Sequence, residues 1–176
     1  RTAVNLNHTA GGPAVEKMCV LAEITTIITA TPYLKRLNDA ALQAVLDQRR
    51  VVKAEELIPQ VAKFSILWQA CCCLVLPARW LCSGTADDVA AIVFSSGSTG
   101  DPKGVQLTHR HILANCRAVR QGLDLQAYKD VILSPLPLFH SFGLIPGMWL
   151  GLTHGLSIAA HPDPTDGATI GKLAKE

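Results

Sequence analysis

One short segment, residues 95–105, limits the possible folds of this 176-residue chain more than any other. It reads Ser-Ser-Gly-Ser-Thr-Gly-Asp-Pro-Lys-Gly-Val and lies between two apolar runs, residues 90–94 and 105–107. Such runs, bounded by glycine and proline, are typical of buried strands. A glycine-rich turn between two strands can bring several backbone N–H groups onto one anion. A flexible Ser/Gly linker is the alternative, but a linker has no reason to be enclosed by buried strands.

The side chains of this segment are suited to binding a polyphosphate. The serine and threonine hydroxyls are hydrogen-bond donors, and Lys103 adds a positive charge on a mobile stem. Pro102 has a fixed backbone φ angle, which stiffens the chain directly before this lysine. We therefore predict that phosphate oxygens are bound by Ser95, Ser96, Gly97, Ser98, Thr99, Gly100 and Lys103.

Two other well-known glycine-containing motifs do not fit this segment. The common nucleotide-binding loop places a lysine directly after a glycine and continues into a helix. Here Lys103 follows Pro102, and a strand-like run comes next. The nucleophile turn of serine hydrolases requires the spacing Gly-x-Ser-x-Gly, which residues 97–100 do not have.

Position by position, the segment resembles the phosphate loop of the adenylate-forming (AMP-binding) enzymes. That superfamily includes acyl-CoA synthetases, luciferases and the adenylation domains of peptide synthetases. Its loop reads Ser/Thr-Ser-Gly-Ser/Thr-Thr-Gly-x-Pro-Lys-Gly-Val. A second family signature follows at residues 135–143, Pro-Leu-Pro-Leu-Phe-His-Ser-Phe-Gly. In the family this segment borders the acyl pocket, so the resemblance makes His140 a candidate catalytic-site residue that shapes or gates the acyl channel.

Further segments resemble one subfamily. Residues 5–11 and 161–166 are similar to parts of the acyl–acyl carrier protein synthetase half of bacterial 2-acylglycerophosphoethanolamine acyltransferases, with the long-chain fatty acid ligases as close relatives. The resemblance is weak over residues 51–84. Enzymes of this superfamily are much longer than this chain. The resemblance therefore implies a partial N-terminal AMP-binding domain over residues 1–176, with the C-terminal lid domain absent.

The resemblance also implies a two-step ligation that uses ATP and Mg²⁺. The carboxylate of a fatty acid attacks the α-phosphate of ATP, which gives acyl-AMP and pyrophosphate. A pantetheine thiol, on acyl carrier protein or coenzyme A, then displaces AMP and forms a thioester. The hydroxyl of Thr99 would reach the metal ion. The remaining family residues for magnesium, ribose and catalysis would follow Glu176, so we expect this chain alone to be catalytically inactive.

The order of helical and strand-like segments predicts an α/β fold with a largely parallel sheet flanked by helices. Strands are expected over residues 24–29, 90–94, 105–107, 131–134 and 156–160. Helices are expected where apolar residues recur at helical spacing and a capping residue stands at the start. These are residues 13–22, 31–46, 108–122, 141–154 and from 166 onward. Together these elements fit the N-terminal domain of an adenylate-forming enzyme.

An irregular apolar, helical insert interrupts this order at residues 51–84. Within it, residues 64–76 hold no charged side chain and lie between Lys63 and Arg79. About twenty apolar residues are needed to span a bilayer, so this run predicts a buried or interfacial helix instead. By analogy with enzymes of long acyl chains, we expect a cytoplasmic protein, with peripheral binding to the inner face of the bacterial inner membrane as an option.

Charge and cysteine content restrict the other partners. The formal net charge is +2 and the basic residues are scattered, so there is no electrostatic case for a nucleic acid partner. None of the six cysteines stands in a Cys-x-x-Cys spacing, and the sequence opens without a secretory signal. We therefore expect reduced thiols that behave as small apolar side chains.

Two alternative functions fit parts of the sequence. His161 and Asp166 have the His-x-x-x-x-Asp spacing of glycerolipid acyltransferases, in which an aspartate orients a histidine base. The Pro-Glu-Gly-Thr block that accompanies this pair in those enzymes does not occur in the sequence, so we assign the pair a structural role. The second alternative is an inactive module that binds acyl chains or membranes through residues 64–82.

Overall fold

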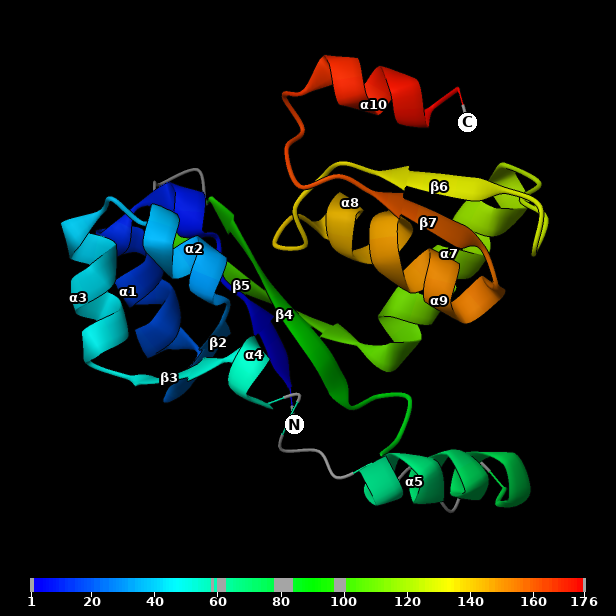
Figure 1. Ribbon diagram of the computed structural model, residues 1–176, viewed down its shortest axis with the longest axis horizontal. Coiled ribbons are helices and arrows are strands. Elements are labelled where there is room, and N and C mark those ends of the chain that lie inside the picture. The colour runs from blue at the N-terminus through cyan, green and yellow to red at the C-terminus, as the bar shows by residue number, and fades with distance from the viewer. Residues whose placement is uncertain (1, 58, 60–62, 78–83, 97–100, 176) are drawn as a thin grey trace. The chain divides into compact units, whose positions relative to one another are not determined.

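The structure is a computed structural model that describes the chain except for residues 1, 58, 60–62, 78–83, 97–100 and 176 (Figure 1). It divides into two compact units. The first combines Arg1–Asn7 with Ala86–Glu176, and the second comprises His8–Thr85. The insert predicted at residues 51–84 therefore belongs to the second unit.

The first unit contains a sheet with the strand order β1-β4-β5. β1 (Ala3–Asn5) runs parallel to β4 (Val89–Ser96), and β4 pairs antiparallel with β5 (Pro102–Thr108). The predicted strands at 90–94 and 105–107 are confirmed, and both extend further toward the turn between them. This hairpin is the antiparallel exception to the parallel pairing that the sequence predicts.

The helix that follows the hairpin begins where its capping residue predicts. α7 (His109–Gly122) is capped by the Thr108 hydroxyl, which accepts a hydrogen bond from the backbone N–H of His111 at 3.2 Å. In return, the Thr108 backbone N–H donates to Nδ1 of His111 at 3.3 Å. Such reciprocal capping satisfies two backbone donors that have no partner within the helix.

A second parallel pair in this unit joins β6 (Val131–Ser134) to β7 (Ser157–Ala160), with Val131 opposite Ser157. The crossover between them is helical, as predicted for 141–154, but it is not one regular helix. It consists of α8 (Ser141–Leu144), the π-helical turn η3 (Ile145–Trp149) and α9 (Leu150–His154). The predicted helical bounds are confirmed, and the π-helical turn lies at Pro146, which has no N–H to donate to the preceding turn.

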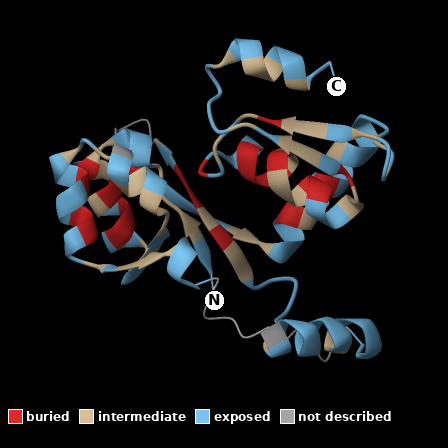
Figure 2. Ribbon diagram, viewed as in Figure 1, coloured by how far each residue is buried: buried red, intermediate tan, exposed pale blue. Residues whose placement is uncertain are grey.

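The core of the first unit lies between β4, α7 and this helical crossover (Figure 2). Gly155 ends α9 with a left-handed backbone (φ +67°), which a residue without a side chain adopts at little cost. After β7, Asp166 caps α10 (Gly167–Leu173) by accepting from the backbone N–H of Thr169 at 3.0 Å, as predicted. The core cluster consists of Ala91, Val93, Ile112, Cys116, Leu144, Ile145, Leu150 and Leu156.

The second unit packs two helices beside a parallel strand pair. η1 (His8–Ala10) leads into α1 (Gly12–Leu21), and β2 (Thr26–Thr29) pairs with β3 (Arg50–Lys53) in parallel register. Its buried apolar side chains come from α1 and from α3 (Ala40–Asp47): Val15, Met18, Cys19, Leu42, Val45 and Leu46. The strand β3 occupies the first residues of the predicted irregular insert.

One partly buried arginine connects several elements of the second unit. The guanidinium of Arg49, whose side chain is 10% exposed, donates to both carboxylate oxygens of Glu16 at 2.7 and 2.8 Å. It also donates to the carbonyl oxygens of Ile24 at 3.3 Å and Val45 at 3.0 Å. These bonds connect α1, α3 and the chain before β2. The hydrogen bonds from Arg49 hold the pKa of Glu16 below its ordinary value.

The prediction of a single helix over residues 31–46 was wrong. α2 (Thr31–Arg36) and α3 are separate, because the Asp39 carboxylate accepts from the backbone N–H groups of Ala41 at 2.9 Å and Leu42 at 3.1 Å. An aspartate in this position starts a new helix. Beyond β3 follow α4 (Ala54–Leu57) and the apolar α5 (Lys63–Val75). Within the described ranges, no helix is long and apolar enough to cross a membrane.

Candidate functional site

The β4–β5 hairpin places two predicted site residues opposite each other. Ser95 faces Lys103 across the antiparallel ladder, and Ser96 is the cross-strand partner of Pro102. Ser95 and Lys103 are exposed, whereas Pro102 is buried. A hydroxyl donor and an ammonium group therefore lie together at the end of the hairpin. The other predicted phosphate ligands, Gly97, Ser98, Thr99 and Gly100, lie outside the described residues, as does the side chain of Ser96.

The strand pleat determines which face of the hairpin these two residues occupy. Side chains alternate between the two faces along a strand, and cross-strand partners share a face. Ser95 and Lys103 consequently share the face of Val93, which is buried in the core of the first unit. That core also contains Leu144 from α8. The hairpin therefore presents its polar end on the same face of the sheet as this core.

A side chain outside the predicted set joins the two motifs. Asn5 is the partner of Val93 in the β1–β4 ladder, and its Nδ2 donates to the carbonyl oxygen of Leu138 at 3.0 Å. Residues 135–143 are thereby held at the carboxyl ends of β1 and β4, beside the start of the phosphate-loop motif. The sequence shows an amide directly after a short apolar run, which indicates a strand end but does not identify its partner.

His140 lies at the start of α8 and is exposed. Its backbone N–H donates to the Pro137 carbonyl at 3.1 Å, and its own carbonyl accepts from Leu144 at 2.9 Å. The imidazole contacts the ring of Phe139, with 4.8 Å between the centroids and an interplanar angle of 47°. Phe139 is buried and so gives the histidine a fixed neighbour on one side. The backbone of His140 is thus held in place while its ring remains accessible to a ligand.

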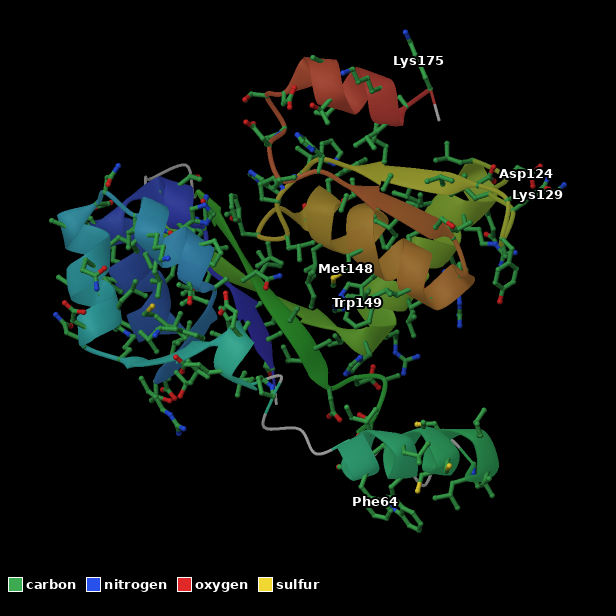
Figure 3. The ribbon with its side chains drawn as sticks, viewed as in Figure 1. Phe64, Asp124, Lys129, Met148, Trp149 and Lys175 are labelled. Atoms are coloured by element: carbon green, nitrogen blue, oxygen red, sulfur yellow. The ribbon has the colours of Figure 1, made fainter. Side chains whose placement is uncertain are left out.

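A cavity of about 380 Å³ lies where β6 and β7 end. Carboxyl ends of parallel strands are where ligands commonly bind in α/β folds, and this volume lies within the usual range of small-molecule pockets. Apart from Ser134 and His161, the lining is apolar. Met148, labelled in Figure 3, contributes from η3. The full lining comprises Ser134, Pro135, Leu136, Pro137, Leu138, Gly147, Met148, Ile158, Ala160, His161 and Pro162.

A close backbone approach determines the shape of this cavity. A Cβ atom built on Gly147 would collide with the Oγ atom of Ser134 and would lie 3.4 Å from its Cβ. Only glycine therefore allows η3 to pass so near the end of β6. The distance between the π-helical turn and the strand, and with it the width of the cavity, depends on these two residues.

The structure brings His161 and Asp166 together at one end of the cavity. Nε2 of His161 lies 3.5 Å from Oδ2 of Asp166, and their side chains are 16% and 38% exposed. Nε2 is buried and makes no hydrogen bond within the described part of the chain. Hydrogen bonds from Thr169 and, to a smaller extent, the charge of His161 hold the pKa of Asp166 below its ordinary value. Nε2 is therefore the nitrogen that the aspartate orients, and any base function would fall to the other ring nitrogen, Nδ1.

Among the residues that the structure describes, no group of three or more His, Cys, Asp or Glu side chains is positioned to hold a metal ion. Thr99, the predicted magnesium contact, lies outside the described residues. Cys19 and Cys116 are buried, and this burial raises the pKa of both thiols. Cys71 and Cys73 are exposed.

Comparison with known proteins gives consistent results. The model of a family described as AMP-binding enzyme matches residues 1–175. The acyl-CoA ligase sidI of Aspergillus fumigatus is 44% identical over 71 residues, which are 40% of this chain and 12% of that protein. The medium-chain fatty-acid–CoA ligase of Escherichia coli is 47% identical over 62 residues, 35% of this chain and 11% of that protein. The chain thus matches only a small part of these curated relatives.

Solved structures share the fold. The o-succinylbenzoate CoA synthetase of Bacillus subtilis, solved with ATP and a magnesium ion, aligns with a TM-score of 0.72 and 18% identity. The alignment covers 99% of this chain and 32% of that one. MatB of Rhodopseudomonas palustris, solved with ATP bound, gives a TM-score of 0.71 at 19% identity over 99% of this chain and 33% of that protein. The α/β fold of mixed sheets flanked by helices is therefore confirmed.

Proposed function

The chain belongs to the AMP-binding enzyme family. On this premise we propose that the whole protein is an ATP-dependent ligase, which activates a carboxylate as acyl-AMP and then transfers the acyl group to a pantetheine thiol. One observation supports this above all others. Ser95 and Lys103 lie opposite each other at the end of the hairpin, and Asn5 holds the second motif beside it.

In the first step, the hairpin binds the β- and γ-phosphates of ATP. Lys103 provides a charge that compensates the polyphosphate, and the Ser95 hydroxyl donates a hydrogen bond from the opposite strand. Magnesium accompanies the phosphates, with Thr99 as the proposed contact from this chain. Because attack at phosphorus requires little covalent chemistry from the protein, positioning and charge compensation supply most of the rate acceleration.

We further propose that the apolar part of the fatty acid occupies the cavity beneath residues 135–138. Its apolar lining suits an alkyl chain, and its place at the carboxyl ends of β6 and β7 suits a substrate. His140 follows this lining directly and is accessible. It is the proposed residue that shapes the passage between the cavity and the hairpin, where the carboxylate would meet the α-phosphate.

Coenzyme A and acyl carrier protein are the two candidate acceptors. The curated relatives are named as CoA ligases, which favours coenzyme A. Acyl carrier protein rests on the resemblance of residues 5–11 and 161–166 to the carrier-protein synthetases. Thioester formation measured with each acceptor at equal concentration distinguishes them. We also retain a membrane surface as a partner of this cytoplasmic protein, with α5 as the contacting element.

We do not carry the acyltransferase alternative forward. His161 and Asp166 do lie together, but the Pro-Glu-Gly-Thr block that accompanies this pair in the acyltransferases does not occur in the sequence. Substituting His161→Ala in the whole protein therefore leaves acyl transfer to a lysophospholipid unchanged, if any such transfer occurs. A selective loss of that transfer, with acyl-AMP formation intact, would restore the alternative.

ATP–pyrophosphate exchange tests the proposal in the whole protein with a fatty acid present. Lys103→Ala removes the proposed phosphate contact and should lower exchange by about a hundredfold or more. Lys129→Ala is the matched control, because Lys129 is exposed and donates to Gln126 at the surface of the same unit. Equal exchange in both variants would contradict the proposal. The 176-residue chain alone should release no pyrophosphate.

A further inference from the structure

Asn5 connects two segments that the proposed reaction must bring together. It is the partner of Val93 in the parallel β1–β4 ladder, and its Nδ2 donates to the Leu138 carbonyl oxygen at 3.0 Å. Leu138 belongs to residues 135–143, which we call the acyl segment because the fatty acid is proposed to bind beside them. Asn5, β4 and the acyl segment all belong to the first unit, so this contact lies within one compact part of the chain.

The donor end of this hydrogen bond lies close to the phosphate-binding end of the hairpin. Ser95 follows Val93 by two residues on β4, which is about 7 Å of strand. Ser95 in turn faces Lys103 across the β4–β5 ladder. Because β1 pairs with the same β4, the ladder fixes the position of Asn5 relative to these two proposed phosphate ligands.

The acceptor end lies in the acyl segment, which is braced by contacts of its own. The His140 backbone N–H donates to the Pro137 carbonyl oxygen at 3.1 Å. A Cβ atom built on Gly143 would collide with the carbonyl oxygens of Leu136 and Pro137, so only glycine allows α8 to lie so close to them. Leu138 lies within this braced turn and lines the cavity. A shift of the Leu138 backbone would therefore move His140 and part of the cavity wall with it.

The hydrogen bond specifies a placement that apolar packing does not. Phe139, next to Leu138, is buried, but the hydrophobic effect that favours its burial has no preferred direction. A hydrogen bond between an amide and a carbonyl requires a donor–acceptor distance of about 3 Å and a nearly linear N–H···O angle. The Asn5 amide therefore fixes where the Leu138 carbonyl lies relative to the end of β4.

We propose that Asn5 is a positioning residue for carboxylate activation, because its hydrogen bond to Leu138 sets the distance between the acyl segment and the hairpin. This inference rests on the proposed function and adds a residue that lies outside both sequence motifs. Reacting groups must approach to about 3–3.5 Å, and a displacement of about 1 Å can lower a rate about a hundredfold. Loss of the hydrogen bond should therefore impair the use of the fatty acid and leave ATP binding unchanged.

ATP–pyrophosphate exchange in the whole protein tests the inference. Asn5→Leu provides a side chain of similar size without a donor. Thr2→Val is the matched control, because the Thr2 hydroxyl donates to the carbonyl oxygen of Val89, at the other end of β4, at 3.1 Å. Binding of a fluorescent ATP analogue without fatty acid counts the intact nucleotide sites in each variant. Urea unfolding compares the stability of the two variants.

For Asn5→Leu, we expect kcat/KM for the fatty acid, per nucleotide site, to fall about tenfold or more. The affinity for the ATP analogue should change less than about twofold. Thr2→Val should lose a similar amount of stability and keep both values. Asn5→Gln retains an amide on a longer stem and should lose less exchange than Asn5→Leu. A merely structural role would reduce the number of intact nucleotide sites and leave the exchange per site unchanged.

Two results would overturn the inference while the proposed function stands. The first is exchange per nucleotide site that is equal in Asn5→Leu and Thr2→Val. The second is a loss of exchange in Asn5→Leu that an equal loss of affinity for the ATP analogue explains, since Asn5 would then act on the nucleotide alone. An unsubstituted whole protein without exchange on any fatty acid would overturn the proposed function, and this inference with it.

Discussion

Two apolar segments of this chain, β4 and α5, have opposite surroundings. In β4, Ala91 and Val93 are buried because β1 and β5 pair with the strand on both sides and α7 contributes to the same core. In α5, residues of similar apolar character are exposed. The difference shows that apolar composition identifies segments whose side chains favour burial. Whether they are buried within the fold depends on which elements pack against them.

The largest expected effect is the loss of stability when a leucine in each region is replaced by alanine, which tests this comparison directly. Leu150 is 2% exposed in the core of the first unit, whereas Leu74 on α5 is 87% exposed. Leu150→Ala should lower the free energy of unfolding by about 2–5 kcal/mol. Leu74→Ala should change it by less than about 0.5 kcal/mol. Urea unfolding of both variants measures the difference. Equal losses would mean that α5 is packed into the fold and would remove the contrast.

A smaller effect is expected where the crossover approaches β6. Gly147→Ala places a methyl group against the Ser134 hydroxyl oxygen and should cost about 1–3 kcal/mol of unfolding free energy. Ser134→Ala removes that oxygen, so the double variant should recover most of the loss. Urea unfolding of the two single variants and the double variant measures this coupling. Purely additive losses would show that the two residues do not determine the spacing of η3 and β6.

The smallest effect concerns pH and the second unit. Arg49 holds the pKa of Glu16 below its ordinary value of 4.5, so the carboxylate binds its proton less readily in the folded chain than in the unfolded one. Its contribution to stability is therefore complete above pH 4.5 and is lost as the pH falls below that value. Arg49→Met should lower the urea midpoint at pH 7, and the difference from the unsubstituted chain should shrink on acidification. An unchanged difference between pH 7 and pH 3 would contradict the role of this ion pair.

Local signals in the sequence predicted much of the fold correctly. The strands of the hairpin follow from their apolar runs, and the starts of α7 and α10 follow from Thr108 and Asp166, whose side chains cap the next turn of backbone. These features depend on residues that lie close together in the chain. For the same reason, the predicted site residues Ser95 and Lys103 both come from one continuous motif, and the structure adds that they face each other.

Some features could not be predicted from the sequence, because two local signals conflict or because the contact joins residues far apart in the chain. Asp39 caps α3 although the apolar spacing continues through it, so the periodic pattern concealed a helix start. Val51 and Val52 form a strand only because β2 lies beside them. The hydrogen bond from Asn5 to Leu138 joins residues that are 133 positions apart. No pattern within a single segment contains that information.

The most direct test of the central claim is to locate the triphosphate on the whole protein. An ATP analogue with a lysine-acylating group on its γ-phosphate labels the lysine nearest to that phosphate, and peptide mass spectrometry identifies it. The hairpin geometry predicts that Lys103 is labelled first and that excess ATP prevents the labelling. Labelling of Lys129 or Lys172 in its place, or labelling of Lys103 that ATP does not block, would contradict the account.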